Sequence, residues 1–462
     1  MSRVGAVSGT GTVGSAARGW PGRASRPARL ATLPLGAVGT AVAGRLRVLA
    51  GADPDRVRAD ARATNAARTR RVLGGLKGGA LKAGQVLATV EALFPADPET
   101  TWASALHGLT GDTGGLPFTD VEPVLRAGLG ADWQRWLPEL DRTATAAASI
   151  GQVHRGRWYD GRAVAVKLQY PGVAAALRAD LRLVSAATRA AASVAPGAAL
   201  PPLAREMRTR FVDELDYARE AAAQRRFAAA FAGDPEVAVP EVVEHGGGVL
   251  VTTWLAGEPL GPWSTTATQA ERDLIGERYQ RFQLSAAART GLMHTDPHPG
   301  NFRVLPDGRL GVLDFGSVLS APGGMPSAFG ALIRALLGDD LAVIRERLLA
   351  GGFVRPGVEP DVARLTGILA PFSVPAAHEV FSYSPEWLRA QFGRLGNPRD
   401  PDFGVALQLT LPPEQLFTQR VWLGVVGVLC MLRATVPVAP ELRRWLPGFT
   451  DQGPGKVDLT VM

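Results

Sequence analysis

Apolar and polar positions are patterned differently along the chain, and the change predicts a small region with strands ahead of a larger helical region. Across residues 53–94, alanine, leucine and arginine recur at the spacing of an amphipathic helix. Residues 108–120 predict a loop, which a short helix at residues 121–128 follows. After Pro138 the pattern becomes that of strands.

Two Asp-Gly pairs stand between short apolar-rich runs. Asp-Gly at such a place is a strong signal of a β-hairpin, because both residues tolerate the backbone angles of a tight turn. The sequence therefore predicts one hairpin before the long helices and a second inside the helical region. The runs are residues 149–158 and 162–168 around Asp160-Gly161, and residues 302–305 and 309–313 around Asp307-Gly308.

Helices account for most of the remaining pattern. Residues 172–194 and 202–232 predict two helices that Pro196-Gly197 separates, and residues 249–254 predict a further strand. From Pro259 onward the chain reads as mostly helical apart from the second hairpin. We therefore expect a small strand-containing lobe followed by a larger helical lobe.

Two apolar segments resemble export or membrane signals and fall short of them. Residues 30–43 end in a sequence like a signal-peptide cleavage site, but the charged stretch before them is too long, and Pro34 and three glycines interrupt or follow the run. Residues 421–432 are strongly apolar but number only twelve, whereas a spanning helix needs about twenty. We expect this second segment to be a buried helix.

Composition favours a globular chain in a reducing compartment. Of 462 residues, 46% are hydrophobic and 20% are charged, which suits two or three packed units or one two-lobed enzyme with an extension. Cys430 is the single cysteine, which excludes a disulfide framework within the chain and leads us to expect a cytoplasmic location.

The excess positive charge lies in the first fifty residues. The formal net charge is +7, and residues 1–50 hold seven arginines and no acid, so residues 51–462 balance to zero. A nucleic-acid-binding domain would carry its basic surface on the folded part, so we expect no nucleic-acid partner. A solvated, arginine-rich terminus is the favoured interpretation. Peripheral contact with an anionic membrane, at its inner face, is the alternative.

Lys167 closes a run of small apolar residues in the first predicted hairpin. A buried ammonium needs an anionic partner, which makes a lysine at this place unusual. Protein kinases carry a lysine on their third strand that holds the α- and β-phosphates of ATP. Taken alone, the pattern favours a structural lysine at a strand end.

Two further motifs change that interpretation. Residues 294–301 have the spacing H-x-D-x4-N of a kinase catalytic loop, in which Asp296 would orient or deprotonate the acceptor and Asn301 would hold a metal ion. The second hairpin leads directly into Asp314-Phe315-Gly316, where Asp314 would chelate magnesium. Three short motifs in this order and spacing predict a nucleotide site far more specifically than any one of them.

Lys167 needs a carboxylate partner, and the helix predicted at residues 202–232 offers Glu214, Asp216 and Glu220. Asp216 and Glu220 are four residues apart and share a helical face, so one of them is expected to point into the cleft. The alternative is that these acids pair with neighbouring arginines on a solvated face.

Two other patterns carry less weight. Residues 9–14 match G-x-G-x-x-G but lack the strand before and the βαβ unit after that a dinucleotide site requires. His294, Asp296 and His298 alternate like metal ligands, as in a metallohydrolase. That reading leaves both Lys167 and the motif at residues 314–316 unexplained.

With these motifs, the chain resembles the UbiB/AarF family of atypical protein-kinase-like ATPases over about residues 60–440, and in particular its soluble actinobacterial-type branch. The hallmark of that family is a K-x-G-Q motif in an N-terminal helical extension, and Lys82-Ala83-Gly84-Gln85 matches it. Without the resemblance, these four residues would be an ordinary piece of helix.

The resemblance also implies roles for other residues. It places Ala146-Ala147-Ala148-Ser149 where ordinary kinases have a glycine-rich nucleotide loop, and alanines restrict the backbone there. It matches Glu214 and Asp216 to the family's E-x-D motif, and Glu220 to the partner of Lys167. No Ala-Pro-Glu follows residues 314–316, so a platform for a peptide substrate is not evident.

The expected fold is α+β, a two-lobed protein-kinase-like fold with a helical extension. The expected parts are a basic segment at residues 1–50, the extension at residues 51–140, an N-lobe at residues 141–258 and a C-lobe at residues 259–462. With ATP or ADP and Mg²⁺ as cofactors, the expected function is ATP hydrolysis or phosphoryl transfer to a small-molecule or lipid-pathway substrate of the quinone or isoprenoid class. The alternatives are a non-catalytic nucleotide switch or lipid-binding chaperone and, more remotely, a metallohydrolase.

Overall fold

The structure is a computed structural model, in which the chain divides into two compact units, residues 1–76 and 77–462. In the first unit, Arg47 and Asp60 form an exposed ion pair at 3.1 Å. All further description concerns the second unit. The described residues are 115–147, 150–175, 177–178, 215–354, 357–395, 408–410 and 413–450, with the single residues 47, 53, 57, 60, 64 and 405.

Several predictions fall outside the described residues and stay predictions. They are residues 9–14, Lys82-Ala83-Gly84-Gln85, Ala148, Ser149, Glu214, nearly all of the helix at residues 53–94, the loop at residues 108–114, and residues 179–194 and 202–214 of the two predicted helices.

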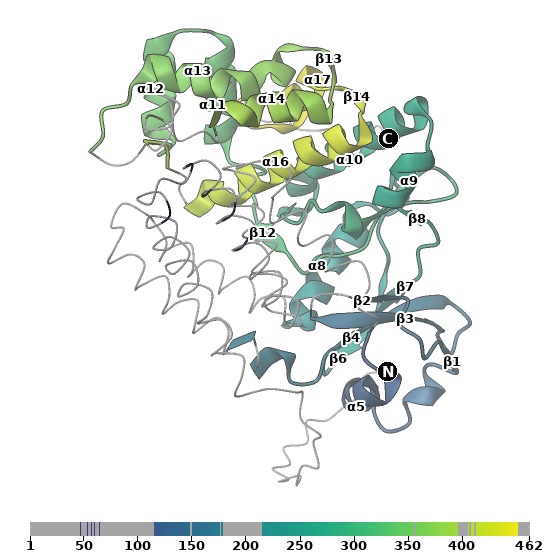
Figure 1. Cartoon of the computed structure of the whole chain (residues 1–462). Coiled ribbons are helices and arrows are strands. Elements are labelled where there is room, and N and C mark those ends of the chain that lie inside the picture. The colour runs from purple at the N-terminus through teal and green to yellow at the C-terminus, as the bar shows by residue number, and fades with distance from the viewer. Residues whose placement is uncertain are drawn as a thin grey trace. The chain divides into compact units, whose positions relative to one another are not determined.

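The small lobe is an antiparallel sheet with helix α5 (Phe118–Leu129) packed on one face. The sheet has six strands in the order β1-β3-β4-β7-β6, with β2 paired to β3 (Figure 1). Its central hairpin, β3 and β4, confirms the first Asp-Gly prediction. The strands are β1 (Glu139–Leu140), β2 (Ala146–Ala147), β3 (Gly151–Arg157), β4 (Ala163–Gln169), β6 (Val242–Gly246) and β7 (Val249–Thr253), and a short 3-10 turn η1 (Trp133–Arg135) precedes them.

Alternation along β4 decides which side chains face α5. Val164, Val166 and Leu168 are fully buried in the core that α5 shares with the sheet. Successive side chains of a strand point to opposite faces, so Lys167, which stands between two of these residues, lies on the other face. The sequence pattern of β4 thus separates the core of the lobe from the one charged residue of the strand.

Helix α8 (Tyr217–Ala230) begins later than predicted. Asp216 is its N-cap, and the Asp216 carboxylate accepts hydrogen bonds from the backbone N–H groups of Ala218 and Arg219 at 3.0 and 3.1 Å. The prediction of one continuous helix at residues 202–232 is therefore wrong at residues 215–216. Asp216 ends up capping the helix instead of sharing a face with Glu220, because a short carboxylate satisfies the free N–H groups of a helix start.

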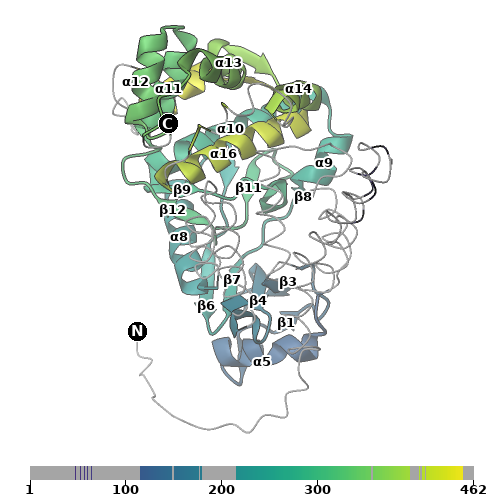
Figure 2. The ribbon, with the colours of Figure 1, turned by 60° about the vertical axis from the view of Figure 1, so that its left-hand side comes forward.

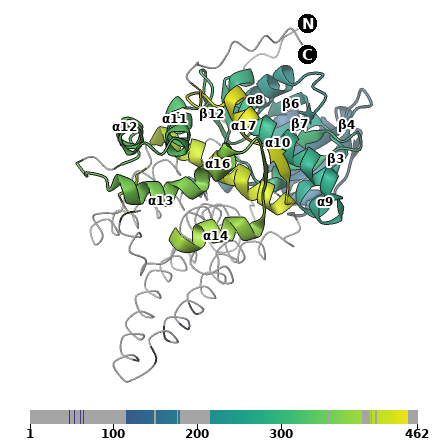
Figure 3. The same cartoon turned by 90° about the horizontal axis from the view of Figure 1, so that it is seen from above.

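The large lobe is mostly helical, as predicted, and is organised around α10 (Gln269–Thr290). A capping box between Thr268 and Glu271 begins α10, and Gly291 ends it with a φ of 66°. Helix α16 (Pro413–Leu432) packs against α10 in one apolar core (Figure 3). The other helices are α9 (Leu260–Thr266), α11 (Ser327–Leu337), α12 (Leu341–Ala350), α13 (Val362–Ser373), α14 (Pro385–Leu395) and α17 (Ala439–Trp445), with 3-10 turns η2 (Pro299–Asn301) and η3 (Val374–Ala377).

Short strands lie between these helices. β10 (Phe302–Val304) and β11 (Leu310–Val312) confirm the second predicted hairpin and belong to a sheet of order β5-β11-β10-β8. Several strands were not predicted, because two or three residues are too few to show a period. They are β5 (Val237–Ala238), β8 (Glu258–Pro259), β9 (Leu292–His294), β12 (Val318–Ser320), β13 (Val380–Ser382) and β14 (Thr435–Pro437).

Residues 421–432 form the C-terminal part of α16, and most of their apolar side chains lie in the core of the large lobe, which confirms the buried helix. Across the described parts of the chain, every helix is too short or too polar to cross a bilayer. Within the second unit, α11, α12 and α13 lie at the end away from α5 (Figure 2).

Candidate active site

Lys167 and Glu220 form a buried ion pair between β4 and α8. The Lys167 Nζ donates to Glu220 Oε1 and Oε2 at 2.7 and 3.0 Å, and the two side chains are 16% and 3% exposed. Burial opposes the charge of Lys167, but the nearby carboxylates of Asp314 and Glu220 outweigh it and raise the pKa of Lys167 well above its usual value. The structure therefore brings together the lysine and one of its three proposed carboxylate partners.

Asp314 completes this charged cluster from the other lobe. Its Oδ2 lies 3.4 Å from the Lys167 Nζ, and its Oδ1 accepts a hydrogen bond from the Gly316 backbone N–H at 2.8 Å. The next residue, Phe315, is fully buried and packs against Phe227 of α8 with ring centroids 4.8 Å apart. The phenylalanine thus anchors the segment in the core, while the Asp314 side chain beside Lys167 stays 37% exposed.

His294 links the loop at residues 294–301 to Asp314 through a hydrogen bond. Its side chain is fully buried, and burial lowers the pKa of His294, so the ring is neutral at physiological pH. Its Nε2 lies 2.8 Å from the Asp314 backbone carbonyl, and since a carbonyl only accepts, that nitrogen carries the proton. The Thr295 hydroxyl donates to the Ser317 carbonyl, so a second bond joins the same two segments.

Asp296 and Asn301 lie side by side at the end of this loop. The Asn301 Nδ2 donates to Asp296 Oδ2 at 2.9 Å and to the Asp296 carbonyl at 3.1 Å. Because the Asn301 amide nitrogen donates these hydrogen bonds, the amide oxygen is the atom that could bind a metal ion. Asp296 and Asn301, for which the H-x-D-x4-N spacing predicts a catalytic and a metal-binding role, are thus in direct contact.

The β10–β11 hairpin brings Asn301 and Asp314 to one end of its ladder. Phe302 pairs with Val312, and the Leu313 N–H donates to the Asn301 carbonyl at 2.9 Å. The two predicted metal ligands, Asn301 and Asp314, therefore stand next to these paired residues in the chain. An amide oxygen and a carboxylate are the hard oxygen donors that Mg²⁺ prefers. This donor set therefore fits magnesium.

The histidines of the alternative metal site serve other contacts. His294 bonds to the Asp314 carbonyl, and His298 Nδ1 accepts a hydrogen bond from the Gly300 backbone N–H at 3.0 Å. Among the residues that the structure describes, no group of three or more His, Cys, Asp or Glu side chains is arranged to hold a metal ion.

The nucleotide loop and the E-x-D motif are only partly described. Ala146 and Ala147 form β2, which is exposed and pairs with Val153 and Gln152 of β3. The role of these alanines in nucleotide binding stays a prediction. Asp216, the described acid of the E-x-D motif, caps α8 and stands four residues before Glu220, which contacts Lys167.

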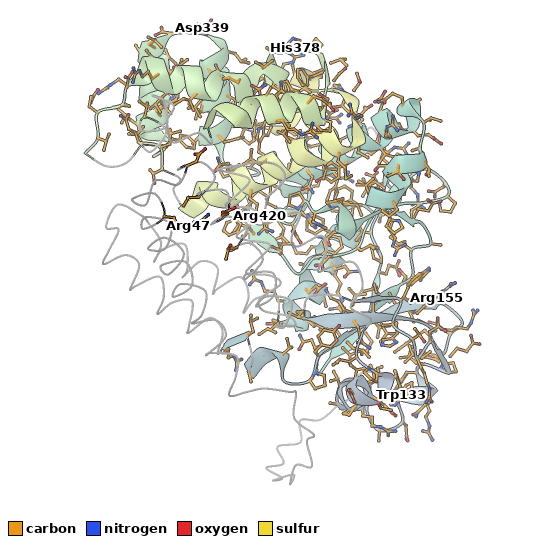
Figure 4. The ribbon with its side chains drawn as sticks, in the orientation of Figure 1. Arg47, Trp133, Arg155, Asp339, His378 and Arg420 are labelled. Carbon is orange, nitrogen blue, oxygen red and sulfur yellow. The ribbon has the colours of Figure 1, made fainter. Side chains whose placement is uncertain are left out.

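Two residues at this site were missed from the sequence. Arg420 of α16 donates from Nη2 to Asp296 Oδ1 at 3.0 Å, across 124 positions of the chain (labelled in Figure 4). The ring of Tyr217 lies 5.2 Å from the Lys167 Nζ, and its buried hydroxyl has no hydrogen-bond partner among the described residues. Neither residue belongs to a local motif, so no sequence signal marks them.

Comparison with known proteins also identifies kinase-like relatives of this chain. A family model described as the ABC1 atypical kinase-like domain matches residues 111–348. The chain is 28% identical over 334 residues to the atypical kinase coq-8 of Caenorhabditis elegans, and 32% identical over 248 residues to the atypical kinase COQ8 of Saccharomyces cerevisiae. These alignments cover 70% and 52% of the chain, and 43% and 48% of the two relatives, so the chain spans less than half the length of these curated relatives.

A solved structure extends the comparison to three dimensions. The complex of Rv3197 with erythromycin, from Mycobacterium tuberculosis, is similar with a TM-score of 0.65 at 35% sequence identity. The similarity covers 87% of this chain and 100% of that one. It confirms the two-lobed kinase-like fold and, with the family match over half of the chain, the resemblance to UbiB-type proteins. The chain belongs to the ABC1 atypical kinase-like family, which includes the COQ8 proteins.

Proposed function

We propose that this chain is a magnesium-dependent enzyme that binds ATP and either hydrolyses it or transfers its terminal phosphoryl group to a small-molecule or lipid-pathway acceptor. One observation carries the proposal. The buried Lys167–Glu220 pair lies within 3.4 Å of Asp314, and the hairpin that carries Asp314 also presents Asn301 beside Asp296. This is the arrangement that phosphoryl transfer by kinases requires.

Each residue of the cluster has a role that its contacts support. Lys167 holds the phosphates, and Glu220 fixes the direction of the lysine side chain, because the pair leaves one face of the ammonium toward Asp314. Asn301 and Asp314 would hold magnesium, which supplies positive charge to the phosphate oxygens when it is bound. Asp296 orients the acceptor hydroxyl or a water and receives its proton.

The class of acceptor rests on the relatives. Those at about 30% identity are named atypical kinases, which supports phosphoryl chemistry, and the UbiB resemblance supports a quinone or isoprenoid substrate. A peripheral contact with an anionic membrane would bring such a substrate to the site. Because the chain spans less than half of these relatives, the acceptor is part of the proposal.

The test is ATP turnover by the full-length chain, with Asp314→Asn as the variant. We expect magnesium-dependent turnover in the wild type and none above background in Asp314→Asn. The matched control is Asp307→Asn, which changes an exposed aspartate at the turn of the same hairpin, paired with Arg309. Turnover that survives Asp314→Asn would refute the metal assignment.

A non-catalytic nucleotide switch is the alternative that this assay separates. Turnover and ATP binding are measured with and without liposomes that contain anionic lipid. Tight ATP binding with no turnover under either condition would favour the switch over the enzyme.

A second candidate function is macrolide binding. One observation favours it, because the solved relative at 35% identity is a complex with erythromycin. Calorimetric titration of the full-length chain with erythromycin, with and without ATP, tests it. No heat of binding under either condition would count against this function and leave the nucleotide proposal intact.

A further inference from the structure

The carboxylate of Asp296 is held from two sides. Asn301 donates to its Oδ2 at 2.9 Å, and Arg420 donates to its Oδ1 at 3.0 Å. The two oxygens are thus held by donors from different parts of the chain, and together these contacts fix the plane of the carboxylate. A proton-accepting carboxylate works best when its direction is fixed in this way.

The arginine comes from a helix that packs directly on the catalytic loop. Gly424, one turn after Arg420 on α16, lies so close to Pro297 that a Cβ at residue 424 would overlap the proline ring. Tyr279 of α10 donates its hydroxyl hydrogen to the Pro297 carbonyl at 2.7 Å from the other side. Arg420 and Gly424 therefore place one face of α16 against residues 296 and 297.

The loop itself lacks the cation that conventional kinases place before the aspartate. In the pattern H-R-D, an arginine precedes the aspartate, whereas here Thr295 stands at that position. The Thr295 hydroxyl bonds to the Ser317 carbonyl at 3.1 Å, so it serves the segment after Asp314. The cation beside Asp296 comes instead from 124 residues further along the chain.

Arg420 pairs with Asp296 through a direct ion pair at 3.0 Å. Within the described part of the chain, Asp296 is the one carboxylate within salt-bridge distance of its guanidinium. The two side chains are 31% and 28% exposed, so solvent screens the attraction between their charges only in part. By contrast, Arg345 and Glu359 form an ion pair on the open surface, with side chains 46% and 75% exposed.

We propose that Arg420 is a positioning residue for the reaction, which holds the Asp296 carboxylate in the direction that the acceptor meets. The inference rests on the proposed function, because it gives Asp296 the role of orienting the acceptor. Helix α16 then supplies a support for the catalytic loop from the C-terminal part of the chain. Arg420 acts through Asp296 and leaves nucleotide binding to Lys167 and Asp314.

The experiment is a double-mutant cycle in the full-length chain, with Arg420→Ala, Asp296→Asn and the two combined. We expect Arg420→Ala to lower kcat for ATP turnover by about 10- to 100-fold, because a misplaced catalytic group costs roughly that much, and to leave KM for MgATP within about twofold. Arg420→Ala in the Asp296→Asn background should cause no further loss, because the residue through which it acts is already disabled.

Two conservative arms separate positioning from folding. Arg420→Lys keeps the charge without the planar donor fork and should fall between Arg420→Ala and the wild type. Added guanidinium ion should restore part of the activity of Arg420→Ala. Arg345→Ala is the matched control, since it breaks an exposed Arg–Glu pair of the same lobe and should leave kcat unchanged.

Several results would overturn the inference. The first is an unchanged kcat in Arg420→Ala. The second is an equal fold loss of kcat when Arg420→Ala is made in the wild type and in the Asp296→Asn background. The third is a change that appears only in KM for MgATP. If the wild type turns over no ATP, the proposed function fails, and the pair is judged by thermal unfolding. Tm shifts that simply add in the double variant would then refute the coupling, and non-additive shifts would support it.

Discussion

Two glycines of α16 allow the contact between this helix and the catalytic loop to be tested with one methyl group. Gly424 faces Pro297, and a Cβ built there overlaps the proline ring. At Gly427, three residues later on the same helix, no described atom beyond the adjacent residues and the backbone of the helix itself lies within 4 Å of such a Cβ. Gly424→Ala and Gly427→Ala are therefore the same substitution on one helix with different surroundings.

The expected free energies of unfolding follow from two opposing effects. Alanine in a helix is about 1 kcal/mol more favourable than glycine, so Gly427→Ala should stabilise the protein by up to about 1 kcal/mol. Gly424→Ala gains the same amount but forces the Pro297 ring to move, and overpacking of this kind costs about 1–3 kcal/mol. The two variants should therefore differ by about 1–3 kcal/mol, with Gly424→Ala the less stable.

Thermal unfolding and ATP turnover measure the two consequences. A difference of 1 kcal/mol shifts Tm by roughly 2–4 °C for a domain of about 150–250 residues, so the two melting curves should be resolved. Turnover should fall in Gly424→Ala alone, because the displaced proline follows Asp296 directly in the chain. Equal Tm shifts in both variants, with equal turnover, would refute the close contact between α16 and the loop.

Three further predictions concern the Lys167 side of the site. Glu220→Gln should lower the free energy of unfolding by about 1–3 kcal/mol, which is less than for a fully broken buried pair because Asp314 still faces Lys167. The folded-state pKa of Lys167 lies above the usual 10.5, so the contribution of the ion pair to the free energy of unfolding is fully present below pH 10.5 and is lost as the pH rises through the folded-state pKa. Urea unfolding should therefore show the same loss of stability for Glu220→Gln at pH 7 and at pH 9. Asp216→Ala should remove the cap of α8 and cost about 1 kcal/mol by urea unfolding, whereas Asp216→Asn should keep most of it; an equal loss in both would show that the cap is unimportant. Tyr217→Phe should leave Tm unchanged or slightly higher, because its buried hydroxyl has no partner among the described residues, and a clear drop in Tm would reveal a missing contact.

Local sequence was a good guide wherever the signal was short and the partner nearby. Asp-Gly predicted both hairpins, because the turn residues and the flanking apolar runs act within about ten positions. The run of small apolar residues before Lys167 also marked the strand that became β4. The spacing of Asp296 and Asn301 likewise described a contact that forms inside one loop.

Prediction was weaker where several local structures suit the same residues. Asp216 and Glu220 fit a common helical face, yet Asp216 caps α8, because a cap satisfies backbone N–H groups that a continuous helix would already have paired. Strands such as β9 and β12 contain three residues each and exist through pairing with each other, so no periodicity marks them. These elements depend on partners that are distant in the chain.

The sequence by itself determined which groups make up the candidate site: a lysine at a strand end, H-x-D-x4-N, and Asp-Phe-Gly in the order of a kinase-like site. The residues alone left three acids as possible partners of Lys167, and the resemblance named Glu220; the packing of α8 on the sheet is what brings Glu220 to the lysine. Only the tertiary structure brought Arg420 to Asp296, because that contact depends on how α16 packs against the loop and not on any spacing along the chain. Motifs record which groups a reaction needs, whereas long-range packing selects the neighbours that orient them.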